Sequence, residues 1–138
     1  MKKLGLICCL FVALSFSTSC LEKKVDSSEI KVVSAEEMQS ILAQEDVQLV
    51  DVRTSNEYDK SHIVSAQNID FKSPTFDEDV EQLDKNKPVI LYCKSGGRSA
   101  KCAKKLKDAG FKKIYDLEGG ISKWQYSDKL EISKNRNI

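Results

Sequence analysis

Short blocks of apolar residues, separated by polar stretches, divide most of the chain into alternating strands and helices. The clearest strand follows Pro88 and occupies 89–93, where every residue is apolar or aromatic. Such a run is typical of a strand that is buried on both faces. Four further strands are expected at 30–33, 47–52, 66–69 and 113–117.

Helix signals fill the intervals between these strands. A Ser or Thr followed three residues later by Glu, the capping box that begins a helix, occurs at Ser34–Glu37 and at Thr54–Glu57. Further helices are expected from Pro74, from about Arg98 to Ala109, and after Gly119–Gly120. The alternation predicts an α/β domain with a central parallel sheet of about five strands and helices on both faces.

The first nineteen residues have a different pattern. Lys2 and Lys3 precede the almost entirely apolar stretch 4–16, which is too short for a membrane span and typical of a signal peptide. Small residues then precede Cys20, as in the lipobox of bacterial lipoproteins. We therefore expect a signal peptide at 1–19 and lipid attachment at Cys20, with cleavage and free export as the alternative.

After processing, residues 20–29 would form a polar tether between a membrane and the domain. The protein would then be exported, to the periplasm or the cell surface, and held there by its lipid anchor. The charged end of the chain, residues 127–138, is expected to fray as a tail.

Composition excludes several classes of protein. The 138 residues include 22 Lys and Arg against 21 Asp and Glu, so no strong basic field indicates a nucleic-acid partner. Of the five cysteines, only Cys20, Cys93 and Cys102 follow the signal peptide, too few for a disulfide scaffold. No long apolar stretch of the domain suggests an obligate oligomer, and we expect a monomer.

Candidate chemistry lies at the end of the strand 89–93. Ligands of open α/β sheets bind beyond the carboxyl ends of the strands, where Cys93 lies. Gly96 and Gly97 follow it, directly before a helix, so backbone N–H groups and the helix dipole converge on the thiol. Such a loop favours the reactive thiolate, and Arg98 adds a permanent positive charge.

Three sequence blocks stand out along the domain. The first block is Asp51-Val52-Arg53 with Glu57-Tyr58 and His62-Ile63; the second is the loop Cys93-Lys-Ser-Gly-Gly-Arg98-Ser99; the third is Leu117-Glu-Gly-Gly-Ile121 with Trp124. In order and spacing they resemble the signatures of the rhodanese family; each motif alone is weak, but three in register are specific. The resemblance predicts a single rhodanese-like domain over 30–126.

The resemblance implies a sulfurtransferase with Cys93 as its nucleophile. In that family the loop cysteine takes a sulfane sulfur from a small anionic donor such as thiosulfate and holds it as a persulfide. It then passes the sulfur to cyanide, to a thiol or to the thiol of a partner protein, without a metal or an organic cofactor. The loop residues that would bind the donor and the persulfide are Lys94, Ser95, Gly96, Gly97, Arg98 and Ser99.

Four other residues are expected to support this site. Asp51 at a strand end would bind loop backbone, and Arg53 would face Glu57 at the i+4 position. His62, the only histidine, matches a loop-fixing position of the family, and thiolate chemistry needs no base. Ser61 stands before it where many family members have Gly, so a positive φ there would cause strain.

Alternatives to sulfur transfer remain open from the sequence. A Cys-based phosphatase or an arsenate reductase is less favoured, because such phosphatases have five residues between Cys and Arg, and only four separate Cys93 from Arg98. The domain could instead be a non-catalytic module that presents a thiol or a surface to a partner. Cys102 could form a redox disulfide with Cys93, although its helical position favours a core cysteine.

Overall fold

A computed structural model describes residues 28–135 of the chain. The predicted signal peptide and Cys20 lie outside these residues, as does all but the end of the tether. Within residues 28–135, no helix is long and apolar enough to cross a membrane. The elements, in chain order, are β1 (Glu29–Val33), α1 (Ala35–Gln44), β2 (Gln48–Asp51), α2 (Ser55–Lys60), β3 (Ser61–Ile63), β4 (Gln67–Asn68), α3 (Phe76–Val80), β5 (Val89–Tyr92), α4 (Gly97–Asp108), β6 (Lys113–Leu117), α5 (Gly120–Trp124) and β7 (Ile132–Lys134).

Five of the strands form one parallel sheet in the order β1-β6-β5-β2-β4. β5 lies in the middle of this sheet, and its four residues are all buried, as its uninterrupted apolar sequence predicts. The parallel sheet of five strands is the architecture expected from the alternation of strand and helix.

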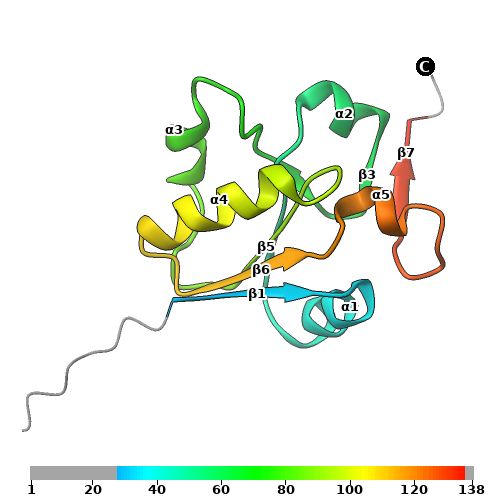
Figure 1. Cartoon of the computed structure of the whole chain (residues 1–138), viewed down its shortest axis with the longest axis horizontal. Coiled ribbons are helices and arrows are strands. Elements are labelled where there is room, and N and C mark those ends of the chain that lie inside the picture. The colour runs from blue at the N-terminus through cyan, green and yellow to red at the C-terminus, as the bar shows by residue number, and fades with distance from the viewer. Residues whose placement is uncertain (1–27, 136–138) are drawn as a thin grey trace, which may run out of the picture.

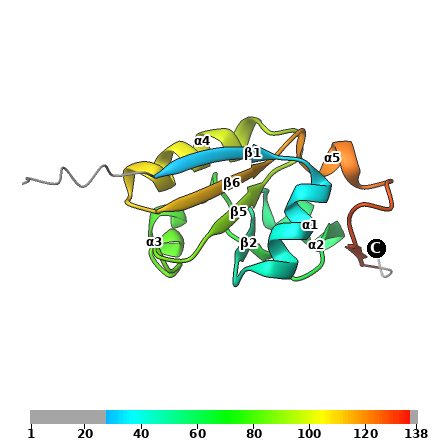
Figure 2. The same cartoon turned by 90° about the horizontal axis from the view of Figure 1, so that it is seen from below.

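Helices cover both faces of the sheet, and each face has its own core (Figures 1 and 2). On one face, α3 and α4 bury residues such as Phe76 and Leu106 against the sheet. On the other face, α1 and α5 contribute Met38 and Ile121. Neighbouring strand residues alternate between the two cores, which is why Leu91 belongs to the first and Tyr92 to the second.

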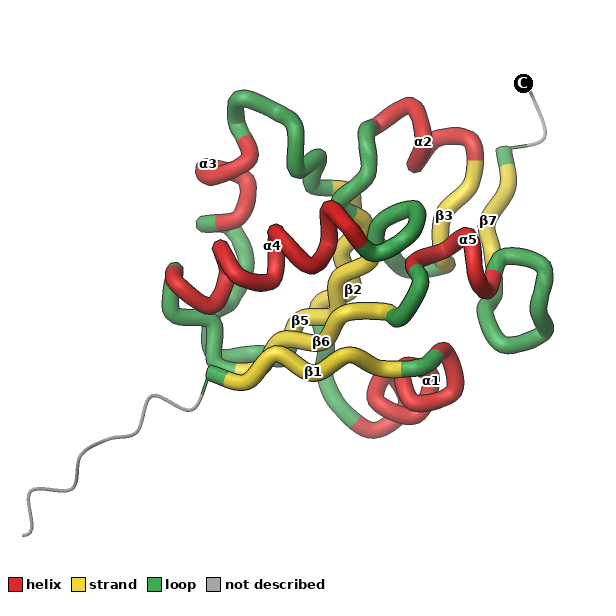
Figure 3. Tube along the Cα trace, in the orientation of Figure 1, coloured by secondary structure: helices red, strands yellow, loops and turns green. Residues whose placement is uncertain are grey.

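The carboxyl ends of the parallel strands meet at one edge of the sheet. The loop after β5, the beginnings of α4 and α5, and α2 gather at this edge, although they come from distant parts of the sequence (Figure 3). Because β5 lies between β2 and β6, the residues that follow it lie at the centre of this edge.

Residues 127–135, the described part of the expected tail, do not fray as predicted. Leu130 is buried in the second core, and β7 pairs antiparallel with β3, placing His62 opposite Ser133. This second, two-stranded sheet satisfies backbone groups of both segments. The charged composition of residues 127–135 conceals two apolar positions, Leu130 and Ile132, that pack against the second core.

Candidate active site

Cys93 lies between the buried strand β5 and the helix α4, with only 1% of its surface exposed. Gly96 directly precedes the helix at φ +102°, a left-handed conformation that glycine adopts without strain. This turn brings the N–H of Gly96 to 3.1 Å from the Cys93 Sγ, to which it donates a hydrogen bond. The thiol therefore lies inside the curve of the loop, at the N-terminus of α4.

Burial by itself would raise the pKa of the Cys93 thiol, but hydrogen bonds outweigh it. The Ser99 hydroxyl is the strongest of the groups that lower the pKa, followed by backbone N–H groups of Ser99, Gly96 and Ser95. Their net effect holds the pKa of Cys93 below its usual value. The arrangement favours the thiolate, the form that attacks sulfur and carbon electrophiles.

The beginning of α5 packs against the Cys93 loop and fixes its backbone through two hydrogen bonds. The Ile121 N–H donates to the carbonyl oxygen of Cys93 at 2.9 Å, and the Ser122 N–H donates to that of Lys94 at 3.0 Å. Gly120 lies so close that a Cβ built on it would come within 2.6 Å of the same two carbonyl oxygens. The third sequence block thus has a definite role: it fixes the backbone of the Cys93 loop.

Arg98 and Glu57, 41 residues apart, form a bidentate ion pair beside the loop. Its two nitrogen–oxygen distances are 2.7 and 2.9 Å. Glu57 also accepts from the Thr54 N–H in the capping box of α2. The Arg98 hydrogen bond is the main reason that the pKa of Glu57 is lowered to about 2, with burial opposing it. The charge of Arg98 is therefore largely compensated within the protein.

The prediction that Arg53 faces Glu57 is wrong. Arg53 instead donates from Nη2 to the Asp51 carboxylate at 2.6 Å and to the Ser61 carbonyl oxygen at 2.6 Å. Asp51 also accepts from the Arg53 backbone N–H, so the expectation that Asp51 binds loop backbone is confirmed. Asp51 is fully buried and Arg53 almost so, and a buried pair gains more by mutual contact than by a partly exposed partner.

His62 lies on β3, where its ring stacks on Tyr58 with ring centroids 3.9 Å apart. Its Nδ1 is 2.9 Å from the Tyr58 carbonyl oxygen. Both contacts fit a residue that fixes local structure. Ser61, before it, has φ −166°, which is ordinary extended backbone, so this serine causes no strain. The positive φ in this region belongs to Ser65, at 70°.

Cys102 lies on α4 in the core between this helix and the sheet. Burial, and then the neighbouring Asp116 carboxylate, raise the pKa of the Cys102 thiol to about 12. A thiol that stays protonated at neutral pH is a poor resolving nucleophile. Both Cys93 and Cys102 are free, and the surroundings of Cys102 favour a core role.

Sequence reasoning missed Asp116, a buried carboxyl group close to the site. It lies on β6 with 6% of its surface exposed, and no hydrogen-bond partner of its Oδ1 is found among residues 28–135. Burial raises the pKa of Asp116, and a hydrogen bond from Ser99 only partly opposes this shift. The sequence of β6 does signal it, because Asp116 is the one charged residue in the apolar alternation from Ile114 to Leu117.

Replacing Asp116 with asparagine is expected to stabilise the protein at neutral pH. The raised pKa means that ionisation costs more in the folded than in the unfolded state, where it occurs near pH 3.9. The penalty is absent below that pH and complete above the folded pKa. Asp116→Asn should therefore raise the free energy of unfolding by about 1 kcal/mol at pH 8 and by progressively less towards pH 4. Denaturant titrations of both proteins across this range test it, and a pH-independent difference would contradict it.

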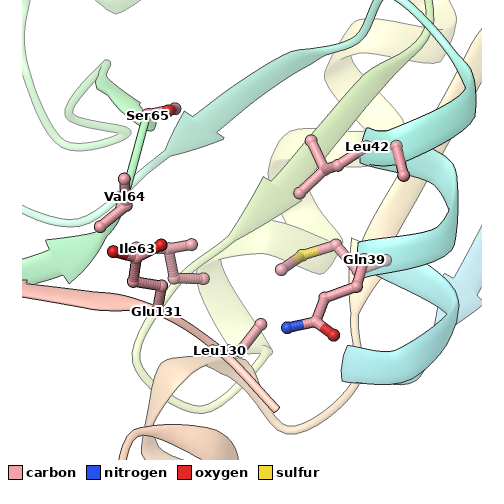
Figure 4. Close-up of a pocket in the computed structure, with 9 residues that line it drawn as sticks. Gln39, Leu42, Ile63, Val64, Ser65, Leu130 and Glu131 are labelled. Carbon is pink, nitrogen blue, oxygen red and sulfur yellow. The ribbon is translucent and has the colours of Figure 1, made fainter. Parts of the chain in front are cut away.

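One cavity of the domain lies apart from this site. It has a volume of about 420 Å³ and lies between α1, the turn after β3 and the segment around Leu130 (Figure 4). Its lining includes no residue of the Cys93 loop. Within residues 28–135, no group of three or more His, Cys, Asp or Glu side chains is placed to hold a metal ion.

A buried cysteine follows the central parallel strand and lies inside a loop with inward N–H groups, which is the arrangement that the resemblance to the rhodanese family predicts. The sequence matches the profile of the Rhodanese-like domain over residues 34–127, and the chain therefore belongs to this family. A crystal structure of a rhodanese-like domain protein from Staphylococcus aureus, 30% identical, has a TM-score of 0.63 and matches over 75% of this chain and 99% of that one.

Curated relatives differ in name and in length. The thiosulfate sulfurtransferase GlpE of Coxiella burnetii is 34% identical over 95 residues, covering 69% of this chain and 87% of GlpE. The uncharacterized protein YqhL of Bacillus subtilis is 39% identical over 77 residues, 56% of this chain and 60% of YqhL. A tRNA uridine(34) hydroxylase from a phytoplasma is 36% identical, but only 35% of its length is covered.

Proposed function

We propose that this protein is a sulfurtransferase in which Cys93 carries a sulfane sulfur as a persulfide. The observation that supports this most directly is the hydrogen-bonded environment of the Cys93 Sγ. The Gly96 N–H donates a hydrogen bond to the sulfur, and Ser99 and Ser95 beside it help to lower the pKa of the thiol. The same donors would stabilise the negative charge of a persulfide. The similarity to thiosulfate sulfurtransferase GlpE adds independent support.

The proposed reaction has two steps. In the first, the Cys93 thiolate attacks the outer sulfur of thiosulfate, the sulfur–sulfur bond of the donor breaks, and sulfite leaves with its electron pair. In the second, a nucleophile such as cyanide or a thiolate attacks the outer sulfur of the persulfide and releases the Cys93 thiolate. One difficult transfer is thereby divided into two easier ones, and no external oxidant or reductant is required.

The loop geometry favours this chemistry over phosphate-ester hydrolysis. Only four residues separate Cys93 from Arg98, so the loop is shorter than the phosphate cradle of Cys-based phosphatases. Glu57 also compensates the Arg98 charge, which leaves that guanidinium less available to a phosphate group.

Intact-mass spectrometry after incubation with thiosulfate tests the proposal. The purified protein should gain the mass of one sulfur atom and lose it again on addition of cyanide, with thiocyanate as the product. An unreacted mass with thiosulfate and with polysulfides would overturn the proposal. Turnover of a small aryl phosphate that depends on Cys93 would then favour the phosphatase alternative, and an inert Cys93 would favour a non-catalytic module.

A further inference from the structure

A second cavity, of about 190 Å³, lies beside the Cys93 loop. Its lining comes from the end of α2 and the start of β3, from the loop itself and from α5, three segments that meet at the carboxyl edge of the sheet (Figure 3). The side chains that matter for its chemistry are Lys60, Ser61, Lys94, Ile121, Ser122 and Gln125. Its α5 wall is joined to the reactive loop through the hydrogen bond from Ile121 to the Cys93 carbonyl oxygen.

The charges around this cavity leave it positive. Arg53 and Glu57 also border it, but Arg53 is paired with Asp51, and Glu57 with Arg98. The two lysines differ from them. Among residues 28–135, the ammonium groups of Lys60 and Lys94 have no ion-pair partner, and both residues are exposed. Two uncompensated positive charges at the mouth of a small cavity favour an anionic ligand.

The position of the cavity restricts what that ligand can be. Cys93 is not among its lining residues, whereas Lys94, the next residue of the loop, is. A molecule that reacts at the Cys93 Sγ and also occupies the cavity must therefore have its anionic group several atoms from its reactive atom. The cavity has roughly the volume of six water molecules, which suits a short aliphatic chain ending in a carboxylate.

We propose that this cavity binds the carboxylate end of a small anionic thiol, the acceptor of the Cys93 sulfur. The inference rests on the proposed sulfur transfer and specifies its second substrate. Lys60 and Lys94 would attract the carboxylate, the side chains of Ser122 and Gln125 offer hydrogen bonds, and Ile121 provides an apolar contact for the methylene groups.

The chemical step balances without another reactant. The acceptor thiolate attacks the outer sulfur of the Cys93 persulfide, a new sulfur–sulfur bond forms on the acceptor, and the original one breaks. Cys93 leaves as the thiolate, and the acceptor leaves as its own persulfide. The acceptor thiolate and the Cys93 persulfide are both anions and repel each other. The positive charges of Lys60 and Lys94 reduce this repulsion as the acceptor approaches.

The test compares two acceptors of similar length, 3-mercaptopropionate, which is anionic, and 2-mercaptoethanol, which is neutral. The full protein is first loaded with thiosulfate, and its persulfide is verified by intact mass. The rate of sulfur loss is then measured against acceptor concentration for the wild type, Lys60→Gln and Lys60→Glu. Lys104→Gln, on the exposed face of α4 and outside the cavity lining, controls for the change in net charge.

The readout is the ratio of the second-order rate constants of sulfur loss, that for the anionic thiol over that for the neutral thiol. Lys60→Gln should lower this ratio about 1.5-fold to fivefold, the range for one exposed charge contact. Lys60→Glu should lower it further, and Lys104→Gln should leave it at the wild-type value. An equal ratio in all four proteins would overturn the cavity proposal, whereas a protein that never gains sulfur in the loading step would overturn the sulfur transfer on which it rests.

Discussion

Replacing Cys93 with serine is expected to abolish sulfur uptake while the fold remains. Serine is close in size to cysteine and can remain inside the same curve of N–H groups, but its hydroxyl group does not ionise at neutral pH and is a weak nucleophile. The loss in kcat/KM for thiosulfate should be on the order of 10³-fold or more, as for other enzymes that lose their nucleophile. Intact mass after thiosulfate should show no added sulfur.

Cys102→Ala is the matched control for this experiment. It removes the other described thiol, which lies in the core on α4, and should leave the gain of one sulfur unchanged. A truncated core side chain lowers stability by about 1 kcal/mol, so thermal unfolding of both variants should be measured alongside. Sulfur uptake that survives in Cys93→Ser, or disappears in Cys102→Ala, would contradict the assignment of Cys93.

The two thiols should also differ in their reaction with iodoacetamide. The pKa of Cys93 is held below its usual value, and that of Cys102 is raised to about 12 by burial and by Asp116. Of these two thiols, Cys93 should therefore be modified first at pH 7, before Cys102 reacts. Peptide mapping distinguishes the two sites, and equal modification of both would contradict the electrostatic difference between them.

Local signals predicted local structure well. The capping boxes at Ser34–Glu37 and Thr54–Glu57 both begin helices as expected, with both of their reciprocal hydrogen bonds formed. The apolar run that contains β5 predicted the central strand, and Gly96 and Gly97 predicted the turn into α4. These features depend on residues close in sequence, whose side chains determine the backbone conformation directly.

Contacts between distant residues were less predictable. The i+4 spacing suggested that Arg53 faces Glu57, but it cannot indicate that Arg98, 41 residues away, occupies that position. In the same way, nothing near Leu130 signals that β3 will pair with β7. The residues involved in the chemistry could be named from the sequence, but their partners depend on the packing of the whole domain.

Outside the Cys93 loop, Gly120 is the position where a small substitution should lower the stability of the domain most. Its φ is +62°, and a Cβ there would lie 2.6 Å from the carbonyl oxygens of Cys93 and Lys94. Gly120→Ala should therefore lower the free energy of unfolding by roughly 2–5 kcal/mol, combining left-handed backbone strain with overpacking. Urea denaturation measures this loss of unfolding free energy. A loss no larger than the roughly 1–2 kcal/mol expected from left-handed backbone strain alone would contradict the prediction.

Two other glycines separate the causes. Gly110 has φ +91° but no atom within 4 Å of its added Cβ, so Gly110→Ala should cost only the strain, about 1–2 kcal/mol. Gly97 has neither a positive φ nor a nearby atom, and Gly97→Ala, in the first turn of α4, should be neutral or slightly stabilising, by up to about 1 kcal/mol. The order of stability should therefore be Gly97→Ala, then Gly110→Ala, then Gly120→Ala.

Gly120→Ala should also reduce activity in the fraction of protein that remains folded. The backbone atoms that its Cβ would displace belong to Cys93 and Lys94, so the strain is relieved by moving the loop that positions the thiolate. A displacement of about 1 Å in such a site lowers rates about 10²-fold. Gly110→Ala, with strain at the far end of α4, should keep its specific activity. A folded Gly120→Ala protein with unchanged sulfur uptake would mean that the contact between α5 and the loop supports the fold without positioning Cys93.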